Sequence, residues 1–179
     1  MSVFEQALAV VLGNEGGQTS DPADPGNWTG GAVGQGECRG TKFGISASAY
    51  PTTDIAALTP ATAAVIYQRD YWDKIAGDAL PPPLALLVFD AAVNNGVARA
   101  IRWLQTAAGV TADGAIGPGT LAAIKAAGAA SGGGSALCAA FLAERLLFMT
   151  ALPTWRHFGA GWARRLCRLP FASVTMTGA

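Results

Sequence analysis

Apolar side chains recur at intervals of three and four residues along most of the chain, which is the spacing of one face of an α-helix. The first stripe consists of Phe4, Ala7, Leu8, Val11 and Leu12. Gly16-Gly17 ends it, because glycine readily adopts the left-handed conformation found at helix C-termini. The pattern predicts a short amphipathic helix at the start of the chain.

The segment from Gln18 to Lys42 has no such periodicity. It contains six glycines and two Asp-Pro pairs, and Asp-Pro favours turns. A loop of this length in a compact domain is usually functional or disordered. We therefore expect a long loop here, with a small β-hairpin within residues 31–44.

Helical spacing returns after the loop. Thr59-Pro60 is typical of a helix start, an N-cap followed by proline, and it predicts a helix that continues to Lys74. Further helices are expected over residues 84–95, 98–108, 120–127, 136–152 and 155–169. The last has an inward stripe of Trp155, Phe158, Trp162, Leu166 and Leu169, with arginines 156, 164, 165 and 168 away from it. The chain is thus predicted to be mainly α.

Composition narrows the chemistry. The 179 residues are 51% hydrophobic and 13% charged, which is typical of a globular protein. The single histidine argues against a zinc hydrolase, which usually needs two or three histidine ligands. Three widely spaced cysteines imply no disulfide framework. We expect no metal site.

The zero net charge hides an asymmetry. Residues 1–90 carry ten acids and four bases, whereas residues 91–179 carry eight bases and two acids. This polarity can position a protein on an anionic surface, or its two faces can attract each other within the fold, and both interpretations stay open. The N-terminus has no basic region typical of a signal peptide, and no stretch approaches the ~20 apolar residues of a membrane span. We expect synthesis in the cytoplasm and another route of export.

Glu15 is the strongest candidate for acid catalysis. It continues the stripe of Val11 and Leu12 at the C-terminal end of the first predicted helix. Burial and the negative end of the helix dipole would both raise the pKa of its carboxyl, so that it could donate a proton near neutral pH. The alternative is a helix-end glutamate that faces solvent. Asp21 and Asp24 could supply the second carboxylate of a glycosidase, or could simply initiate turns.

Other residue pairs give weaker signals. Cys38 and His157 could form a thiol nucleophile and its base, but no helix starts after Cys38 to activate the thiol. Asp90 and Asn94 are four apart on one predicted helix and should be neighbours. The aromatic residues Trp28, Tyr67, Tyr71 and Trp72 could stack on sugar rings or belong to the core. Trp28 is the best ligand candidate among them because it lies in a polar loop.

Several motifs together resemble a known family. Glu15-Gly16-Gly17, the Asp-Pro run of residues 21–26 and Thr41-Lys-Phe-Gly-Ile-Ser46 resemble the N-terminal signature of glycoside hydrolase family 108 lysozymes, muramidases of phages and bacteria. The resemblance continues through residues 67–72. Later motifs are similar to the family's predicted peptidoglycan-binding region: residues 89–94, 103–105, 113–120 and 161–162. Residues 26–41 are longer than the family pattern and add Glu37 as a competing carboxylate.

The resemblance implies a lysozyme-like, mainly helical fold. A catalytic half (1–86) and a peptidoglycan-binding half (87–172) would pack into one globule with a cleft between them. Glu15 would protonate the leaving oxygen of the bond between N-acetylmuramic acid and N-acetylglucosamine. Asp24 or Thr41 would position a water or stabilise the oxocarbenium-like transition state. The predicted substrate contacts are Asp21, Trp28, Tyr71 and Asn94.

The same resemblance sets the expected partners. The protein would bind peptidoglycan glycan strands as a monomer, without nucleic acid, metal or cofactor, and at most peripherally at a membrane. It would reach the periplasmic cell wall through a holin or another export route. A lytic transglycosylase and a non-catalytic peptidoglycan-binding module are the alternatives.

Overall fold

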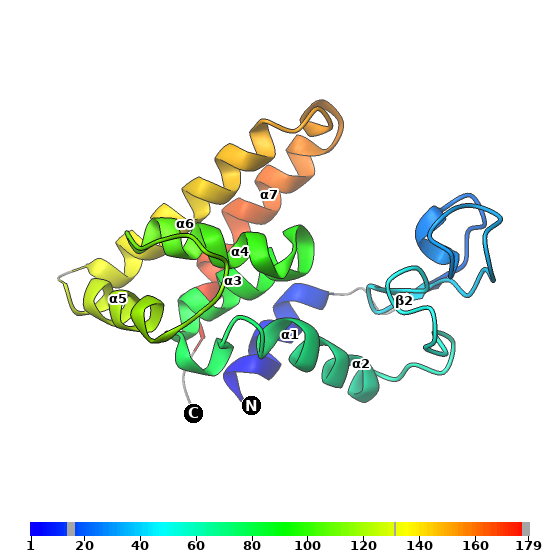
Figure 1. Ribbon diagram of the computed structural model, residues 1–179, viewed down its shortest axis with the longest axis horizontal. Helices are drawn as coiled ribbons and strands as arrows, with labels where there is room; N and C mark the ends of the chain where they lie inside the picture. Colours follow the sequence, from blue (N-terminus) through cyan, green and yellow to red (C-terminus); the bar gives the residue numbers. More distant parts are fainter. Residues whose placement is uncertain (14–16, 131, 177–179) are drawn as a thin grey trace. The chain divides into compact units, whose positions relative to one another are not determined.

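The computed structural model describes residues 1–13, 17–130 and 132–176 (Figure 1). Within these residues the chain is mainly α, as the sequence predicts. The α-helices are α1 Val3–Leu12, α2 Pro60–Tyr67, α3 Pro82–Asn95, α4 Val97–Ala107, α5 Pro118–Ala129, α6 Gly133–Thr150 and α7 Trp155–Ser173. One small sheet contains β1 Gln18–Thr19, β2 Thr41–Lys42 and β3 Ile45–Ser46. The short helical turns are η1 Pro25–Asn27, η2 Gln68–Trp72 and η3 Gly77–Ala79.

The chain divides into two compact units. Residues 1–7 and 68–179 form one, here called the helical unit, and residues 8–67 form the other, here called the loop unit. The boundaries of these units differ from those of the halves 1–86 and 87–172 expected from the sequence. The division into a catalytic half and a peptidoglycan-binding half stays a prediction.

Helix α3 is the centre of the helical unit. Every residue from Leu84 to Ala92 is buried, and α3 packs against α4, α6 and α7 (Figure 1). An aromatic cluster adds to this core: the Trp72 ring lies 5.5 Å from that of Phe4 and 5.4 Å from that of Phe89, centroid to centroid. Trp72 is therefore a core residue, one of the two interpretations that its sequence position allows.

A buried glutamine organises the connection from α4 to α5. Gln105 Nε2 donates to Asp113 Oδ1 (2.7 Å), to the Ala115 carbonyl (2.9 Å) and to Thr120 Oγ1 (3.2 Å). Its Oε1 accepts from the Gly114 N–H at 2.8 Å. The separate motifs at residues 103–105 and 113–120 thus form one hydrogen-bonded cluster.

The loop unit contains a tight β-hairpin. Strands β2 and β3 pair antiparallel, and the two residues between them, Phe43 and Gly44, have φ of 51° and 73°. Positive φ at both positions is the type I′ turn that suits the twist of a two-residue hairpin. Tyr67 Oη donates to the Phe43 carbonyl at 2.9 Å, which helps hold this unfavourable phenylalanine conformation. The hairpin spans 41–46 rather than falling within 31–44, because this turn supplies the required geometry.

The predicted helix from Thr59 to Lys74 starts as expected but changes from α-helical to π-helical after Tyr67. Thr59 Oγ1 accepts from the Thr62 N–H at 3.2 Å, and Thr62 Oγ1 accepts from the Thr59 N–H at 2.8 Å, so the N-cap is confirmed. The α-helix ends at Tyr67 and continues as the π-helical turn η2. The Asp73 N–H donates to the Gln68 carbonyl at 2.8 Å, five residues back, as a π-helix requires.

Helix α7 differs from its predicted stripe. Leu166 and Leu169 are buried, but Phe158 is 57% exposed, and Trp155 and Trp162 are half-buried. The Trp162 ring centroid lies 6.0 Å from that of Trp155 and 5.9 Å from that of Phe158, so the first half of the stripe forms an aromatic surface cluster. The helix also continues through Pro170 to Ser173 rather than ending at 169.

Helix α6 is the one described helix that is long and apolar enough, by length and composition, to cross a membrane. The sequence predicts no such segment because Glu144 and Arg145 interrupt the apolar run, whereas the leucines, alanines and phenylalanines of α6 keep its mean hydropathy high. The core helix of a bundle passes the same test. Four residues of α6 at four-residue spacing are buried in the helical unit, Leu137, Phe141, Arg145 and Met149.

Candidate active site

A buried amide holds the long loop of the loop unit together. Asn27 is fully buried. Its Nδ2 donates to the Asp21 carbonyl at 3.0 Å, and its Oδ1 accepts from Thr41 Oγ1 at 2.8 Å. Its backbone carbonyl accepts from the N–H groups of Arg39 (2.9 Å) and Gly40 (3.1 Å). Asn27 therefore brings two predicted site residues, Asp21 and Thr41, onto one hydrogen-bonded frame.

The two aspartates of the loop shape its turns. Asp21 Oδ1 accepts from the Ala23 N–H at 2.9 Å, and Asp24 Oδ1 accepts from the Gly26 N–H at 2.8 Å, which caps the turn η1. Both residues are exposed. The turn-forming interpretation is thus confirmed for both. It does not exclude a chemical role, because each cap uses one oxygen of a carboxylate that faces solvent.

Two further loop residues have defined partners. Trp28 Nε1 donates to the Pro22 carbonyl at 2.9 Å, which fixes the half-buried indole against the Asp-Pro turn. The competing carboxylate, Glu37, accepts from Arg39 Nε at 2.7 Å. Among the described residues, the loop unit therefore holds Asp21, Asp24, Trp28 and Thr41 in one connected segment, with Glu37 engaged in an exposed ion pair.

Glu15 lies in residues 14–16, outside the described residues. Its assignment as the acid therefore stays a prediction.

The predicted contacts Tyr71 and Asn94 belong to the helical unit. Tyr71 is half-buried in η2. Asn94 is exposed near the end of α3, and its Nδ2 donates to the Asp90 carbonyl at 2.8 Å. Asp90 and Asn94 are neighbours, as predicted, but the bond joins the amide to the backbone rather than to the carboxylate.

The Asp90 carboxylate is instead the centre of a buried ion cluster. Arg145 Nη1 donates to Asp90 Oδ1 at 2.6 Å, and Arg165 Nε donates to Asp90 Oδ2 at 2.8 Å. Arg145 Nε also donates to Asn95 Oδ1 at 2.9 Å. Burial lowers the pKa of Arg145, whereas the charge and hydrogen bond of Asp90 act in the opposite direction. The expectation that Arg165 lies with the free arginines of its helix is wrong, because its guanidinium turns inward to this carboxylate.

A small pocket of about 90 Å³ lies beside the cluster. Its polar lining comes from Asn94, Asn95, Arg145 and Arg165, and its apolar lining from Met149, Leu152, Trp162 and Leu166. Amide and guanidinium N–H groups next to an indole suit a small ligand with both polar and apolar parts. The cluster and the pocket join residues from α3, α6 and α7.

Sequence reasoning missed Asn27 and Arg145. Asn27 has no periodic signal, since it lies in an irregular loop. Arg145 has one that can be recognised: it occupies a position of the four-residue stripe otherwise filled by Leu137, Phe141 and Met149. A charged residue within an apolar stripe requires a buried partner of opposite charge.

The thiol alternative gains no support. Cys38 is exposed, and its Sγ lies 3.8 Å from the Ser20 carbonyl. The exposed His157 ring packs edge-on to Phe158 at 6.4 Å. Neither contact is one that a thiol–imidazole nucleophile requires.

Comparisons with known proteins identify the family. Residues 8–96 match the family model of glycosyl hydrolase 108, and residues 99–167 match a predicted peptidoglycan domain. The solved structure of SagA from Brucella abortus is similar at 32% sequence identity with a TM-score of 0.77, over 97% of this chain and 94% of that chain. No curated protein matches significantly. The chain is therefore a member of the glycosyl hydrolase 108 family, with a C-terminal peptidoglycan domain.

Proposed function

We propose that this glycosyl hydrolase is an N-acetylmuramidase that cleaves the bond between N-acetylmuramic acid and N-acetylglucosamine in peptidoglycan. The family match over residues 8–96 carries the proposal, because it includes Glu15 and the whole Asn27-held loop. The peptidoglycan domain over residues 99–167 supports the same polymer as the substrate. The cell wall is then the place of action.

Glu15 is the proposed general acid. Glycoside hydrolysis needs a protonated carboxyl to deliver a proton to the leaving oxygen while positive charge develops on the sugar ring. In the sequence, Glu15 continues the apolar spacing of Val11 and Leu12, and this pattern is the reason to propose a carboxyl that can donate a proton.

Asp24 and Thr41 are the proposed partners of this acid. The Thr41 hydroxyl hydrogen is used in the bond to Asn27, so its oxygen is left to accept a hydrogen bond from a water. Asp24 supplies a negative charge that can stabilise the oxocarbenium-like transition state. Because the buried Asn27 amide fixes the Thr41 hydroxyl, we assign Thr41 the role of positioning the water.

We assign glycan contacts to both units. In the loop unit these are Asp21 and Trp28, with the indole fixed by its bond to the Pro22 carbonyl. In the helical unit they are Tyr71 and Asn94, and Asn94 borders the pocket that also contains Trp162. Aromatic faces and amide groups are the usual recognition elements for N-acetylated sugars.

The test is digestion of purified sacculi followed by mass spectrometry of the soluble muropeptides. Wild-type protein should release fragments with reducing N-acetylmuramic acid ends. Glu15→Gln should reduce release by about 10²–10⁴-fold, because glutamine cannot donate the proton. Glu37→Gln is the matched control, since it changes the same group in the same unit, and it should retain activity.

Each other result has a definite meaning. Products with 1,6-anhydro ends, which lack one water, would make the protein a lytic transglycosylase. Sacculus binding without release would make it a binding module. A folded Glu15→Gln protein with full activity would remove Glu15 as the acid.

A further inference from the structure

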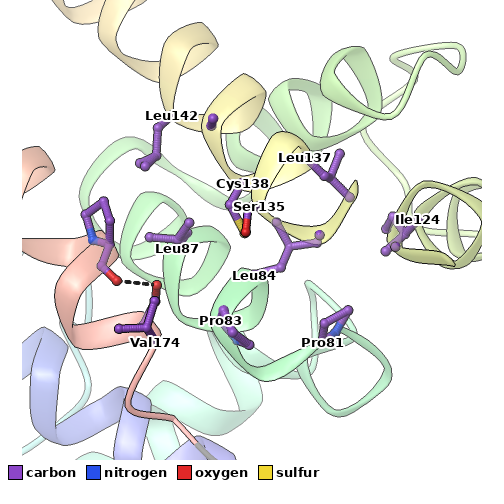
Figure 2. A pocket seen from close by; sticks show the side chains of 15 residues that line it. Pro81, Pro83, Leu84, Leu87, Ile124, Ser135, Leu137, Cys138, Leu142 and Val174 are labelled. Atoms are coloured by element: carbon purple, nitrogen blue, oxygen red, sulfur yellow. Dashed lines mark hydrogen bonds between the residues drawn. The ribbon is translucent and has the colours of Figure 1, made fainter. Parts of the chain in front are cut away.

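The helical unit contains a second and larger pocket, unrelated to the candidate site residues. It has a volume of about 380 Å³ and lies between α3, α5, α6 and α7 (Figure 2). Figure 2 shows Leu84 and Leu87 of α3, Leu137 and Leu142 of α6 and Val174 after α7 around it. This volume is within the range of small-molecule sites, about 300–1,000 Å³.

The lining has the chemistry of a hydrocarbon site. Its side chains are aliphatic apart from Ser135, Cys138 and Ser173, and none is charged. Burial raises the pKa of the Cys138 thiol, so that group is neutral too. A sugar or a peptide would leave its polar groups without partners here, whereas an alkyl chain would not.

Exposed apolar residues continue from the pocket to the surface. Val174, which lines the pocket, is 75% exposed, and the neighbouring Phe171 is 77% exposed. On α6, one turn after the pocket residue Leu142, Leu146 is 39% exposed. Large apolar side chains grouped around an apolar pocket mark an interaction surface rather than scattered surface residues.

A basic edge borders this apolar rim. At about 100° per residue, Val174, Cys167, Phe171, Arg164 and Arg168 follow one another around roughly a third of the circumference of α7. Both arginines are exposed, and α7 contains no acidic residue. The one acid of α6, Glu144, lies about 200° around that helix from Leu142. An apolar strip next to a basic strip is the arrangement of a helix that lies in a membrane interface.

We propose that this face of the helical unit binds the surface of an anionic phospholipid membrane and takes one acyl chain into the pocket. Arg164 and Arg168 contact the lipid phosphates, and Phe171 and Val174 enter the boundary between headgroups and chains. The excess of bases over acids in residues 91–179 draws the same half of the chain to a negative surface. The proposal is independent of the hydrolase reaction.

The first experiment measures co-sedimentation with vesicles of phosphatidylglycerol and phosphatidylcholine, and with phosphatidylcholine alone. The protein should bind the anionic vesicles only. Arg164→Gln/Arg168→Gln should weaken binding about 30-fold. Lys74→Gln/Arg156→Gln, a matched control that removes the same charge from two other exposed positions of the helical unit, should change binding by less than about threefold. Equal losses in the two variants would overturn the proposal, because only net charge would then matter.

The second experiment uses the native cysteines as reporters. In a Cys38→Ser/Cys138→Ser background, a polarity-sensitive fluorophore on Cys167 should shift to the blue with anionic vesicles. In a Cys38→Ser/Cys167→Ser background, lysophosphatidylglycerol below its micelle concentration should protect Cys138 from alkylation, and glycerol phosphate should not. Thermal melts of all variants confirm that they are folded.

Two results would overturn the assignment. If Cys167 shows no shift while vesicles sediment the protein, another surface binds the lipid. If Phe171→Ser abolishes self-association in light scattering and leaves vesicle binding unchanged, the face belongs to a second copy of the chain.

Discussion

Two buried amides, Asn27 in the loop unit and Gln105 in the helical unit, each hold an irregular segment, but in different surroundings. The Gln105 side chain makes four hydrogen bonds to the segment that connects α4 to α5 and to the first turn of α5. These two helices also contribute the buried residues Leu104 and Ile124. The Asn27 side chain makes two, to segments on either side of a long loop. Among the described residues of the loop unit after residue 16, the buried apolar side chains are few, and the first of them is Ile45.

This difference indicates which interactions hold each unit in a defined conformation. In the helical unit, apolar packing positions the helices and the amide completes a connection between two of them. In the loop unit, hydrogen bonds from one amide hold the segment that bears Asp24 and Thr41, two of the proposed catalytic residues. We expect polar substitutions to have local effects in the loop unit and graded, unit-wide effects in the helical unit.

The largest effect should come from Asp90→Ala. Removal of the carboxylate leaves Arg145 buried without its counter-charge, which typically costs about 3–5 kcal/mol in unfolding free energy. Asp73→Ala, at an exposed position of the same unit, should stay within about 0.5 kcal/mol of wild type. Urea unfolding followed by circular dichroism measures both. An Asp90→Ala protein as stable as the control would mean that the ion cluster adds nothing to the bundle.

The comparison itself is tested by Asn27→Leu and Gln105→Met, which keep side-chain size and remove the amide. Each leaves buried groups without partners, at about 1–3 kcal/mol per group. Asn27→Leu should accelerate amide hydrogen exchange within residues 17–46 and leave α3, α4 and α6 unchanged. Gln105→Met should lower the stability of the helical unit and leave the β2–β3 hairpin protected. Faster exchange of the helices in Asn27→Leu, or of the hairpin in Gln105→Met, would contradict this difference between the two units.

A smaller effect separates the two roles of Asp24. Asparagine caps a turn about as well as aspartate, whereas alanine loses about 1 kcal/mol. Asp24→Asn should therefore keep the hydrogen-exchange pattern of η1 and lose muramidase activity, and Asp24→Ala should lose both. If Asp24→Asn is fully active in the sacculus assay, the aspartate is only a cap.

The smallest effect concerns pH. The hydrogen bond from the Ala115 N–H, followed by that from Gln105, lowers the pKa of Asp113. A lowered pKa stabilises the folded state at pH values above the ordinary aspartate value, and this contribution is lost as the pH falls through the folded value. The difference in unfolding free energy between wild type and Asp113→Asn should therefore become smaller as the pH falls from about 5 to about 2. A difference that is constant over this range would contradict a role for the charge.

Local signals predicted much of the fold. Thr59 marks a helix start because a cap depends on only a few adjacent residues, and the predicted end of a helix at residue 95 is followed by Gly96 with a positive φ of 92°. The aromatic half of the α7 stripe was not predictable in the same way, since periodicity assigns a face but not what covers it. The partners of Asp90 lie 55 and 75 residues away in the chain, so no local pattern specifies them. The loop frame is similar: its turns follow from Asp-Pro pairs, but the burial of Asn27 depends on contacts across 14 residues.

The π-helical turn η2 has a consequence for how this chain tolerates changes in length. Tyr67, the last residue of α2, bonds to the hairpin carbonyl of Phe43, and Trp72, the last residue of η2, packs in the aromatic cluster of the helical unit. A π-helical turn contains one residue more than an α-helical one. Deletion of a single residue between Gln68 and Tyr71 would therefore restore regular α-helical winding and leave Trp72 at nearly its present angle around the helix axis relative to Tyr67. The turn therefore takes up one extra residue while Tyr67 and Trp72 keep their phase, and we expect sequences related to this one to differ in length by one residue here more readily than within a regular helix.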